Sequence, residues 1–169
     1  DDDGVWFAKA AEDGKVAEME QLLVAKGVSA DAKAADGTPA LILAAEGGHL
    51  DALKLLHKHG ANLEATNQHG ATALMEAAYY GKADCAEALL EWGADKDAAD
   101  NIGDTALHIA AFNGELECAR LLVRARADRA KKNKQGKTAL EEAREEGKAD
   151  VAALLQQADA NVSIPCPSR

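Results

Sequence analysis

Residues 70–95 read GATALMEAAYYGKADCAEALLEWGAD, and residues 103–128 read GDTALHIAAFNGELECARLLVRARAD. The two stretches place a glycine, a threonine, a leucine, an alanine pair and an Ala-Asp pair at the same positions, 33 residues apart. The pattern also begins at Gly37 and Gly136, and a degenerate copy with one extra residue begins at Gly4. A fixed period of this length is typical of stacked repeats, in which each unit buries its apolar face against its neighbours.

Each unit contains the signals of two short helices and a connecting loop. A threonine that can accept an unpaired backbone N–H, and so cap the first helix, recurs as Thr72, Thr105 and Thr138. In the unit that begins at Gly37, Thr38-Pro39 provides this start one place early, with proline suited to the first helical position. Glycines end the helices, and polar stretches such as ADKDAADNIG lead to the next unit. The sequence therefore predicts an all-α solenoid of about five 33-residue helix-turn-helix units joined by β-hairpin-like loops.

These motifs resemble the ankyrin repeat family. The sequences TALH at 105–108, GGH at 47–49 and GAD at 93–95 match the family's Thr-Pro-Leu-His, Gly-His and Gly-Ala-Asp motifs. The resemblance covers residues 4 to about 157. It implies a repeat array over residues 1–157 and a flexible C-terminal tail at 158–169, with units at about 4–33, 34–66, 67–99, 100–132 and 133–157.

The charge is unevenly distributed along the chain. The net charge of −10 opposes general binding to nucleic acid or to anionic membranes. Between Arg124 and Lys137, however, there are seven basic residues and one acidic residue, whereas the rest of the chain has 12 basic and 28 acidic residues. Arg126 in this segment stands where the repeat has a glycine whose backbone is expected to be left-handed. A non-glycine residue there costs roughly 1 kcal/mol of stability, which indicates that the positive charge was selected despite this cost.

The cysteine count and the hydropathy restrict the location of the chain. Three cysteines fit an intracellular, reducing compartment, with the cytoplasm or nucleus favoured and a processed organelle protein as the alternative. No apolar run approaches the ~18 residues that a membrane span requires.

The residues that could carry catalysis or bind metals form no recognisable motif. His57 and His59 are two residues apart on an expected helix and point to different sides, which opposes a metal site. Cys85 and Cys118 occupy equivalent positions in adjacent units, about 10 Å apart, and are interpreted as small core residues that form no disulfide. The resemblance implies a structural hydrogen bond between His108 and the cap at Thr105. We therefore expect no catalytic, cofactor-binding or metal-binding residues, and no enzyme activity.

The resemblance also implies a concave surface that binds partners, made of the loop tips and the ends of the first helices. Three of the chain's six aromatic residues fall on this surface, with Ile102 beside them. They either cover the contact between helices or anchor a partner, and we favour the second interpretation because aromatic anchors dominate interface energetics. Of the adjacent pair Tyr79-Tyr80, at most one ring is expected to pack fully against the next unit. The predicted partner-binding residues are Gln68, His69, Tyr79, Tyr80, Asn101, Ile102, Asp104, Phe112, Asn113, Arg126, Lys134 and Lys137.

The sequence thus predicts a non-catalytic protein-protein interaction module, an adaptor or scaffold that binds through its concave face. The basic segment is either a solvated charged face or a contact surface, and we favour a protein partner with an acidic segment over nuclear targeting or contact with nucleic acid. We expect the chain to be a monomer by itself. Three alternatives stay open: a permanent structural subunit of a larger assembly, an ankyrin-type kinase inhibitor, and a regulatory fragment of an enzyme whose catalytic domain lies outside these residues.

Overall fold

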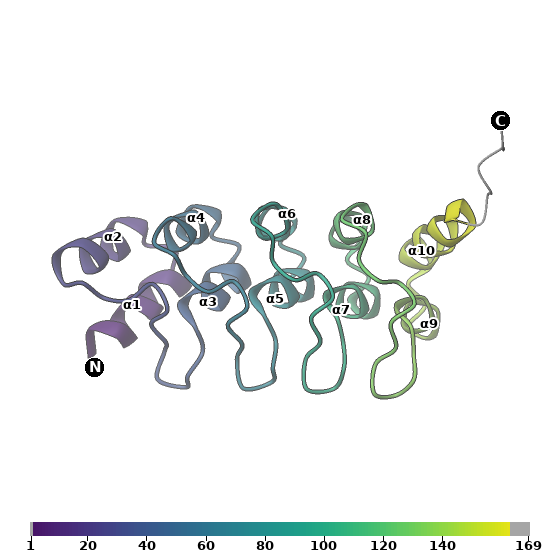
Figure 1. Cartoon of the computed structure of the whole chain (residues 1–169), viewed down its shortest axis with the longest axis horizontal. Coiled ribbons are helices and arrows are strands. Elements are labelled where there is room, and N and C mark those ends of the chain that lie inside the picture. The colour runs from purple at the N-terminus through teal and green to yellow at the C-terminus, as the bar shows by residue number, and fades with distance from the viewer. Residues whose placement is uncertain (1, 163–169) are drawn as a thin grey trace.

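The structure, a computed structural model, describes residues 2–162. These residues form ten α-helices and no β-strand, which confirms the predicted all-α stack. The helices lie in two rows, and long loops project beyond one of them (Figure 1). The row beside the projecting loops, here called the inner row, consists of α1 (Asp2–Glu12), α3 (Ala40–Gly47), α5 (Ala73–Tyr79), α7 (Ala106–Asn113) and α9 (Ala139–Glu145). The outer row consists of α2 (Val16–Ala25), α4 (Leu50–Lys58), α6 (Ala83–Glu91), α8 (Leu116–Arg124) and α10 (Ala149–Val162).

The core follows the stack from end to end. Each inner helix contacts the next inner helix, and each outer helix contacts the next outer helix. The alanine pairs 44–45, 77–78 and 110–111 are fully buried at these contacts, where their small side chains let the helices approach closely. Leu74 and Leu107 are buried beside them, whereas the equivalent Leu140 is half-buried because no described helix covers the far side of α9.

The inner helices begin at the predicted threonine caps. The hydroxyl oxygen of Thr72 accepts a hydrogen bond from the backbone N–H of Met75, and Thr105 and Thr138 form reciprocal capping boxes with the residues three places later. The prediction for Thr38-Pro39 is wrong in detail. Pro39 is the N-cap residue of α3 rather than its first helical residue, and no side chain caps this helix. The backbone N–H of Ala40 instead donates to the carbonyl of Ala32 at 2.9 Å, so the loop itself satisfies the helix start.

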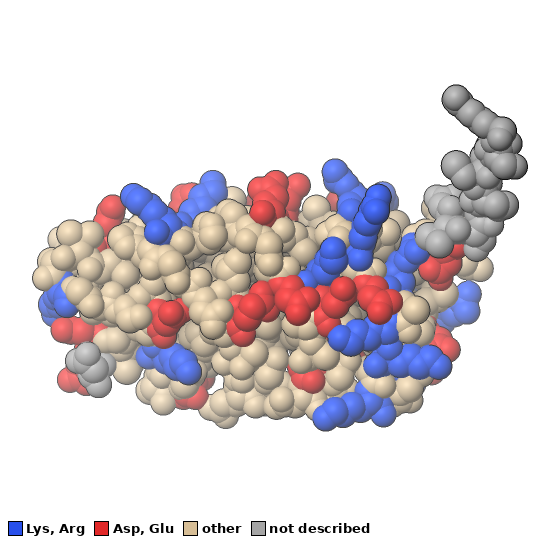
Figure 2. All heavy atoms as spheres, viewed as in Figure 1, with Lys and Arg blue, Asp and Glu red and all other residues tan. Residues whose placement is uncertain are grey.

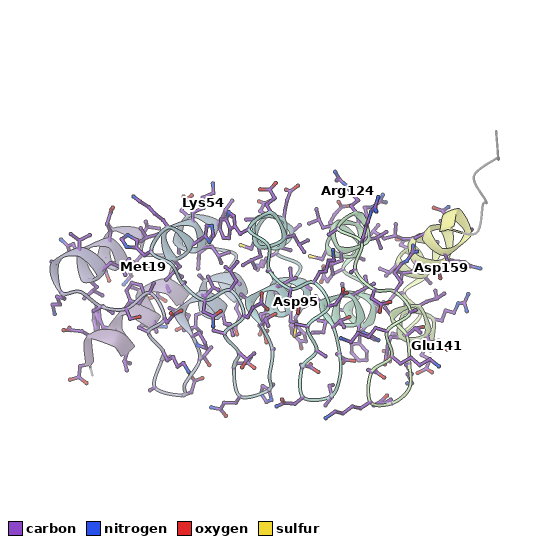
Figure 3. The ribbon with its side chains drawn as sticks, in the orientation of Figure 1. Met19, Lys54, Asp95, Arg124, Glu141 and Asp159 are labelled. Carbon is purple, nitrogen blue, oxygen red and sulfur yellow. The ribbon has the colours of Figure 1, made fainter. Side chains whose placement is uncertain are left out.

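A second set of contacts joins the turns that follow the outer helices. In three consecutive units a carboxylate accepts a hydrogen bond from the backbone N–H that lies 31 residues later: Asp31 from Asn62 at 2.7 Å, Glu64 from Asp95 at 2.8 Å, and Asp97 from Asp128 at 2.7 Å. We call these bonds the interface rungs. Asp95 lies in the middle of the molecule where these turns follow one another (Figure 3). The rungs hold each unit to the next independently of the apolar core.

Two irregularities of the repeat have clear structural positions. The extra residue of the first unit falls in α2, which has 10 residues where α4, α6 and α8 have 9 each. Arg126 has a φ of 63° and is the one non-glycine residue with a positive φ in the part of the chain that the structure describes. The predicted left-handed backbone at Arg126 is thus confirmed.

The two ends of the array are built differently. At the start, Phe7 is fully buried but its neighbour Trp6 is 62% exposed. At the other end, α10 continues to Val162, so residues 158–162 belong to a helix and not to the flexible tail that was expected from 158 onward. The chain has neither glycine nor proline between Gln157 and Val162, so nothing ends the helix earlier. The rest of the expected tail, 163–169, lies outside the described residues. Within residues 2–162, no helix combines the length and the apolar character needed to cross a membrane.

Candidate partner-binding groove

A groove lies between the projecting loops and the inner helices in the second half of the array. Its volume is about 620 Å³, and its walls come from α5, α7, α9 and the loops that precede them. Three consecutive units therefore form it. Eight of the predicted partner-binding residues line this groove: His69, Tyr79, Asn101, Ile102, Asp104, Phe112, Asn113 and Lys137. The structure does not bring the other four, Gln68, Tyr80, Arg126 and Lys134, into its lining.

The two tyrosines lie at the C-terminal end of α5, where the helix stops before a left-handed Gly81. Their rings meet edge to face, with centroids 4.9 Å apart and an interplanar angle of 71°. Tyr79 is 51% exposed and Tyr80 is 50% exposed, so neither ring packs fully against the next unit. Only Tyr79 lines the groove. The adjacent tyrosines are thus half-exposed surface residues, one inside the groove lining and the other outside it.

The centre of the groove is apolar. Ile102 at a loop tip is 61% exposed, and Phe112 near the end of α7 is 48% exposed. Ile109, which lies one helical turn before Phe112, also lines the groove and is half-buried. Large apolar side chains that are half exposed in one concavity are the usual composition of an interface core.

Two equivalent polar pairs, which the sequence motifs described above do not predict, flank this apolar centre. The side-chain amide of Asn67 donates to Glu76 at 3.1 Å, and that of Asn133 donates to Glu142 at 3.0 Å. The nitrogen of Asn133 also donates to Asp104 at 2.8 Å, so two carboxylates converge on one amide. Glu142 is only 7% exposed. The signal was available in the sequence, because both Asn-Glu pairs have the same spacing and lie two repeat periods apart.

Burial disfavours the charge of three carboxylates on the inner helices and their loops. Burial raises the pKa of Glu76, an effect partly opposed by the hydrogen bond from Asn67. Burial likewise raises the pKa of Asp104, and the nearby Asp100 and Glu142 raise it further. On α3, burial and the charge of Glu76 raise the pKa of Glu46. Each of these carboxylates is therefore less stable as an anion than it would be in water.

Several predicted contact residues at the loop tips also have a structural role. The side-chain amide of Gln68 donates to the carbonyl of Asp36 at 2.5 Å, and that of Asn101 donates to the carbonyl of Gln68 at 3.1 Å. The backbone N–H of Asn101 donates to His69, and that of Lys134 donates to Ile102. Because neighbouring tips are bonded to one another, the loop side of the groove is formed before any partner binds.

The basic segment lies mostly outside the groove. In the face shown in Figure 2, a row of acidic side chains crosses the middle of the molecule, and basic side chains gather toward its C-terminal end. Arg124 lies on the outer row, away from the projecting loops (Figure 3). Three of the seven cations have internal contacts: Arg129 pairs with Asp159 at 3.4 Å, Lys131 donates to the carbonyl of Asp97 at 2.5 Å, and Lys137 pairs with Glu145. The other four, Arg124, Arg126, Lys132 and Lys134, are exposed.

The remaining candidates have structural roles. His108 Nδ1 accepts from the backbone N–H of Thr105 at 3.2 Å, so its Nε2–H donates to the carbonyl of Lys137 at 2.9 Å and joins two units. His57 stacks on Trp92 of the next unit, with ring centroids 4.2 Å apart. Cys85 and Cys118 are both 1% exposed and form no disulfide, and burial raises the pKa of Cys118 to about 11. Across the described residues, no group of three or more His, Cys, Asp or Glu could hold a metal ion.

Paired helices in two rows, bonded loop tips and a concave apolar groove define a helical repeat solenoid. A family model described as ankyrin repeats, in three copies, matches residues 7–100 and 95–165. The chain belongs to the ankyrin repeat family. None of the curated proteins matches it significantly. Ankyrin repeats are generally protein-protein interaction modules and generally carry no catalytic activity.

Proposed function

We propose that this chain is a non-catalytic adaptor that binds a protein partner in the groove formed by α5, α7, α9 and their loops. The observation that carries the proposal is the exposure of Tyr79, Ile102 and Phe112 in one preformed concavity. When a partner buries these side chains, each Å² of apolar surface removed from water stabilises the complex by about 25 cal/mol. Aromatic side chains in the centre of such a surface are the type of residue that dominates binding energy.

The adjacent tyrosines provide a matched pair of variants for the test. They have the same chemistry and the same exposure, but only Tyr79 lines the groove. Tyr79→Ala should weaken capture of the native partner, and Tyr79→Ala combined with Phe112→Ala should abolish it, because loss of an interface anchor typically costs about 2 kcal/mol or more. Tyr80→Ala should retain most of the capture. All three variants should melt within a few degrees of the parent chain.

The measurement is affinity purification from the native source with each variant as bait, followed by quantitative mass spectrometry and thermal melting. Loss of stability in Tyr79→Ala with capture retained would mean that these aromatics are core residues, and the proposal would be wrong. A stoichiometric complex that stays together in high salt would favour the alternative that the chain is a permanent structural subunit. A captured kinase whose activity is lost on binding would favour the alternative that the chain is an inhibitor.

The exposed cations outside the groove support a second, separate contact. Arg124, Arg126, Lys132 and Lys134 have no ion pair among the described residues, so an acidic segment of the same partner would find them available. Such a contact would chiefly raise the association rate and would weaken as salt screens it. Replacing the four with glutamine should lower the association rate without changing the melting temperature.

A further inference from the structure

The groove joins an apolar centre to an anionic lining. Its walls contain five carboxylates, Glu76, Asp100, Asp104, Glu142 and Glu146, and a single lysine, Lys137. That lysine already pairs with Glu145. None of the five carboxylates has an ion pair with Lys or Arg in the part of the chain that the structure describes. The lining of the groove is therefore opposite in charge to the basic segment beside it.

The apolar and anionic groups alternate along the stack. Glu76 on α5, Ile109 on α7 and Glu142 on α9 occupy the same position in three consecutive units, 33 residues apart. An apolar side chain thus lies between two carboxylates at the spacing of neighbouring helices. Asp104 strengthens the anionic side near α9, because its carboxylate and that of Glu142 contact the same amide nitrogen of Asn133.

Two of these carboxylates, Glu76 and Asp104, are disfavoured as anions in the free chain, and their hydrogen bonds do not require a charge. Burial raises the pKa of Glu76 and of Asp104, which means that their ionised forms are disfavoured in the empty groove. A glutamine or asparagine at these positions could accept the same hydrogen bonds without charge. Groups that make the free protein less stable without supporting its fold are often retained for binding.

The geometry points to a specific partner chemistry: an extended protein segment that carries a large apolar side chain flanked on both sides by Lys or Arg. The apolar side chain would bind against Ile102, Ile109 and Phe112, and the cations would bind the carboxylates on either side. Neighbouring helices lie about 10 Å apart and an extended chain advances about 3.3 Å per residue, so each cation should lie about three residues from the apolar side chain. This inference rests on the proposed function, since it specifies what the same groove binds.

Selection from a random 12-residue peptide display library tests this chemistry directly. Wild-type protein is the target, and the Phe112→Ala variant is the counter-target that removes peptides bound elsewhere. The enriched peptides should contain an aromatic or large aliphatic residue with Lys or Arg about three residues to each side. Enrichment of Asp or Glu, enrichment without Lys or Arg, or no enrichment over the counter-target would overturn the inference.

The strongest selected peptide, labelled with a fluorophore, then serves as the probe in an anisotropy titration. The double variant Glu76→Gln and Asp104→Asn should bind it about tenfold more weakly and with a smaller salt dependence. Asp84→Asn combined with Glu87→Gln on the exposed face of α6 removes the same number of charges, is the matched control, and should bind as the wild type does. Thermal melting of the double variant should show equal or greater stability, so weaker binding could not be ascribed to misfolding.

The outcomes separate this inference from the proposed function. If the peptide binds and requires Phe112 but is indifferent to the carboxylate variants, the cationic part is wrong and the groove is still a protein-binding site. If capture of the native partner is also indifferent to Tyr79→Ala and Phe112→Ala, the proposed function is wrong as well.

Discussion

Arg126 holds a backbone conformation that glycine adopts without steric cost, with a φ of 63°. We predict that Arg126→Gly raises the free energy of unfolding by about 1 kcal/mol. It should also weaken any contact with an acidic partner segment. Arg124→Ala is the control, because it removes a positive charge from a regular helical position and should give no such gain. Urea unfolding measures the free energy of unfolding of both variants. A less stable Arg126→Gly would contradict the argument from backbone cost.

The stability of the fold should depend on pH through Glu76, because the pKa of Glu76 in the folded chain is raised above the ordinary value of 4.5. A raised carboxylate pKa means that the ionised group destabilises the fold at neutral pH, and that this cost disappears as pH falls through the folded pKa. Glu76→Gln should therefore be more stable than the wild type at pH 7, by less than about 1 kcal/mol because the half-buried group is partly screened by water.

The advantage of Glu76→Gln should shrink as the pH is lowered from 7 toward 4.5, the window in which wild-type Glu76 takes up its proton. Glu87→Gln on the exposed side of α6 serves as the control for removal of one negative charge from the whole chain. Chemical denaturation at several pH values measures the difference. An advantage that stays constant with pH, or appears equally in Glu87→Gln, would show that burial of Glu76 is not its cause.

Single residues also show what the sequence could and could not predict. The caps at Thr72, Thr105 and Thr138 and the buried Leu74 and Leu107 follow from local rules that repeat along the chain, and the structure agrees with these. The exposure of Tyr79, Ile102 and Phe112 follows from their register within the unit. Burial of Glu142 does not follow from local rules, since its neighbour Glu141 is exposed and both read as polar residues of a terminal unit. Glu142 is buried because Asn133, nine residues earlier, folds back to bond with it.

The projecting loops stabilise one another through contacts between neighbouring loops. A Cβ added at Gly103 would lie 2.8 Å from the backbone nitrogen of Lys134 in the next loop, whereas a Cβ added at Gly136 would meet nothing within 4 Å. Both glycines have left-handed backbones, with φ of 82° and 78°. Replacement by alanine therefore imposes a similar backbone cost of about 1–2 kcal/mol at each, and only Gly103→Ala adds a collision between loops.

We predict that Gly103→Ala lowers the free energy of unfolding more than Gly136→Ala does, and that only Gly103→Ala weakens binding in the groove. The physical reason is the hydrogen bond from Lys134 N–H to the carbonyl of Ile102, 3.1 Å long, which the collision would stretch. Urea unfolding and anisotropy with the selected peptide measure the two effects. Equal losses in both variants would mean that the loops do not depend on each other.

At the scale of the whole molecule, the main contacts of each described helix pair are with the neighbouring pair along the stack. A short array of this kind should unfold reversibly in one cooperative transition, because each unit is stable only with its neighbours. We also expect the isolated chain to be a monomer. Far-ultraviolet circular dichroism during thermal melting, together with light scattering on a sizing column, measures both. A spectrum dominated by β structure would contradict the fold, and a dimer mass would contradict the monomer.

The interface rungs have a consequence for how such a chain can change over generations. Donor and acceptor in each rung are 31 residues apart, and consecutive rungs follow one another at the repeat period of 33 residues. Duplication or deletion of one complete 33-residue unit would preserve this spacing, whereas one residue gained in the helices between the two ends of a rung would shift the donor away from its acceptor. The extra residue in α2 precedes Asp31, where the first rung begins, so it lies outside the three rungs. The gene can therefore change its length in whole units far more readily than in single codons, and partner surfaces can be gained or lost one unit at a time.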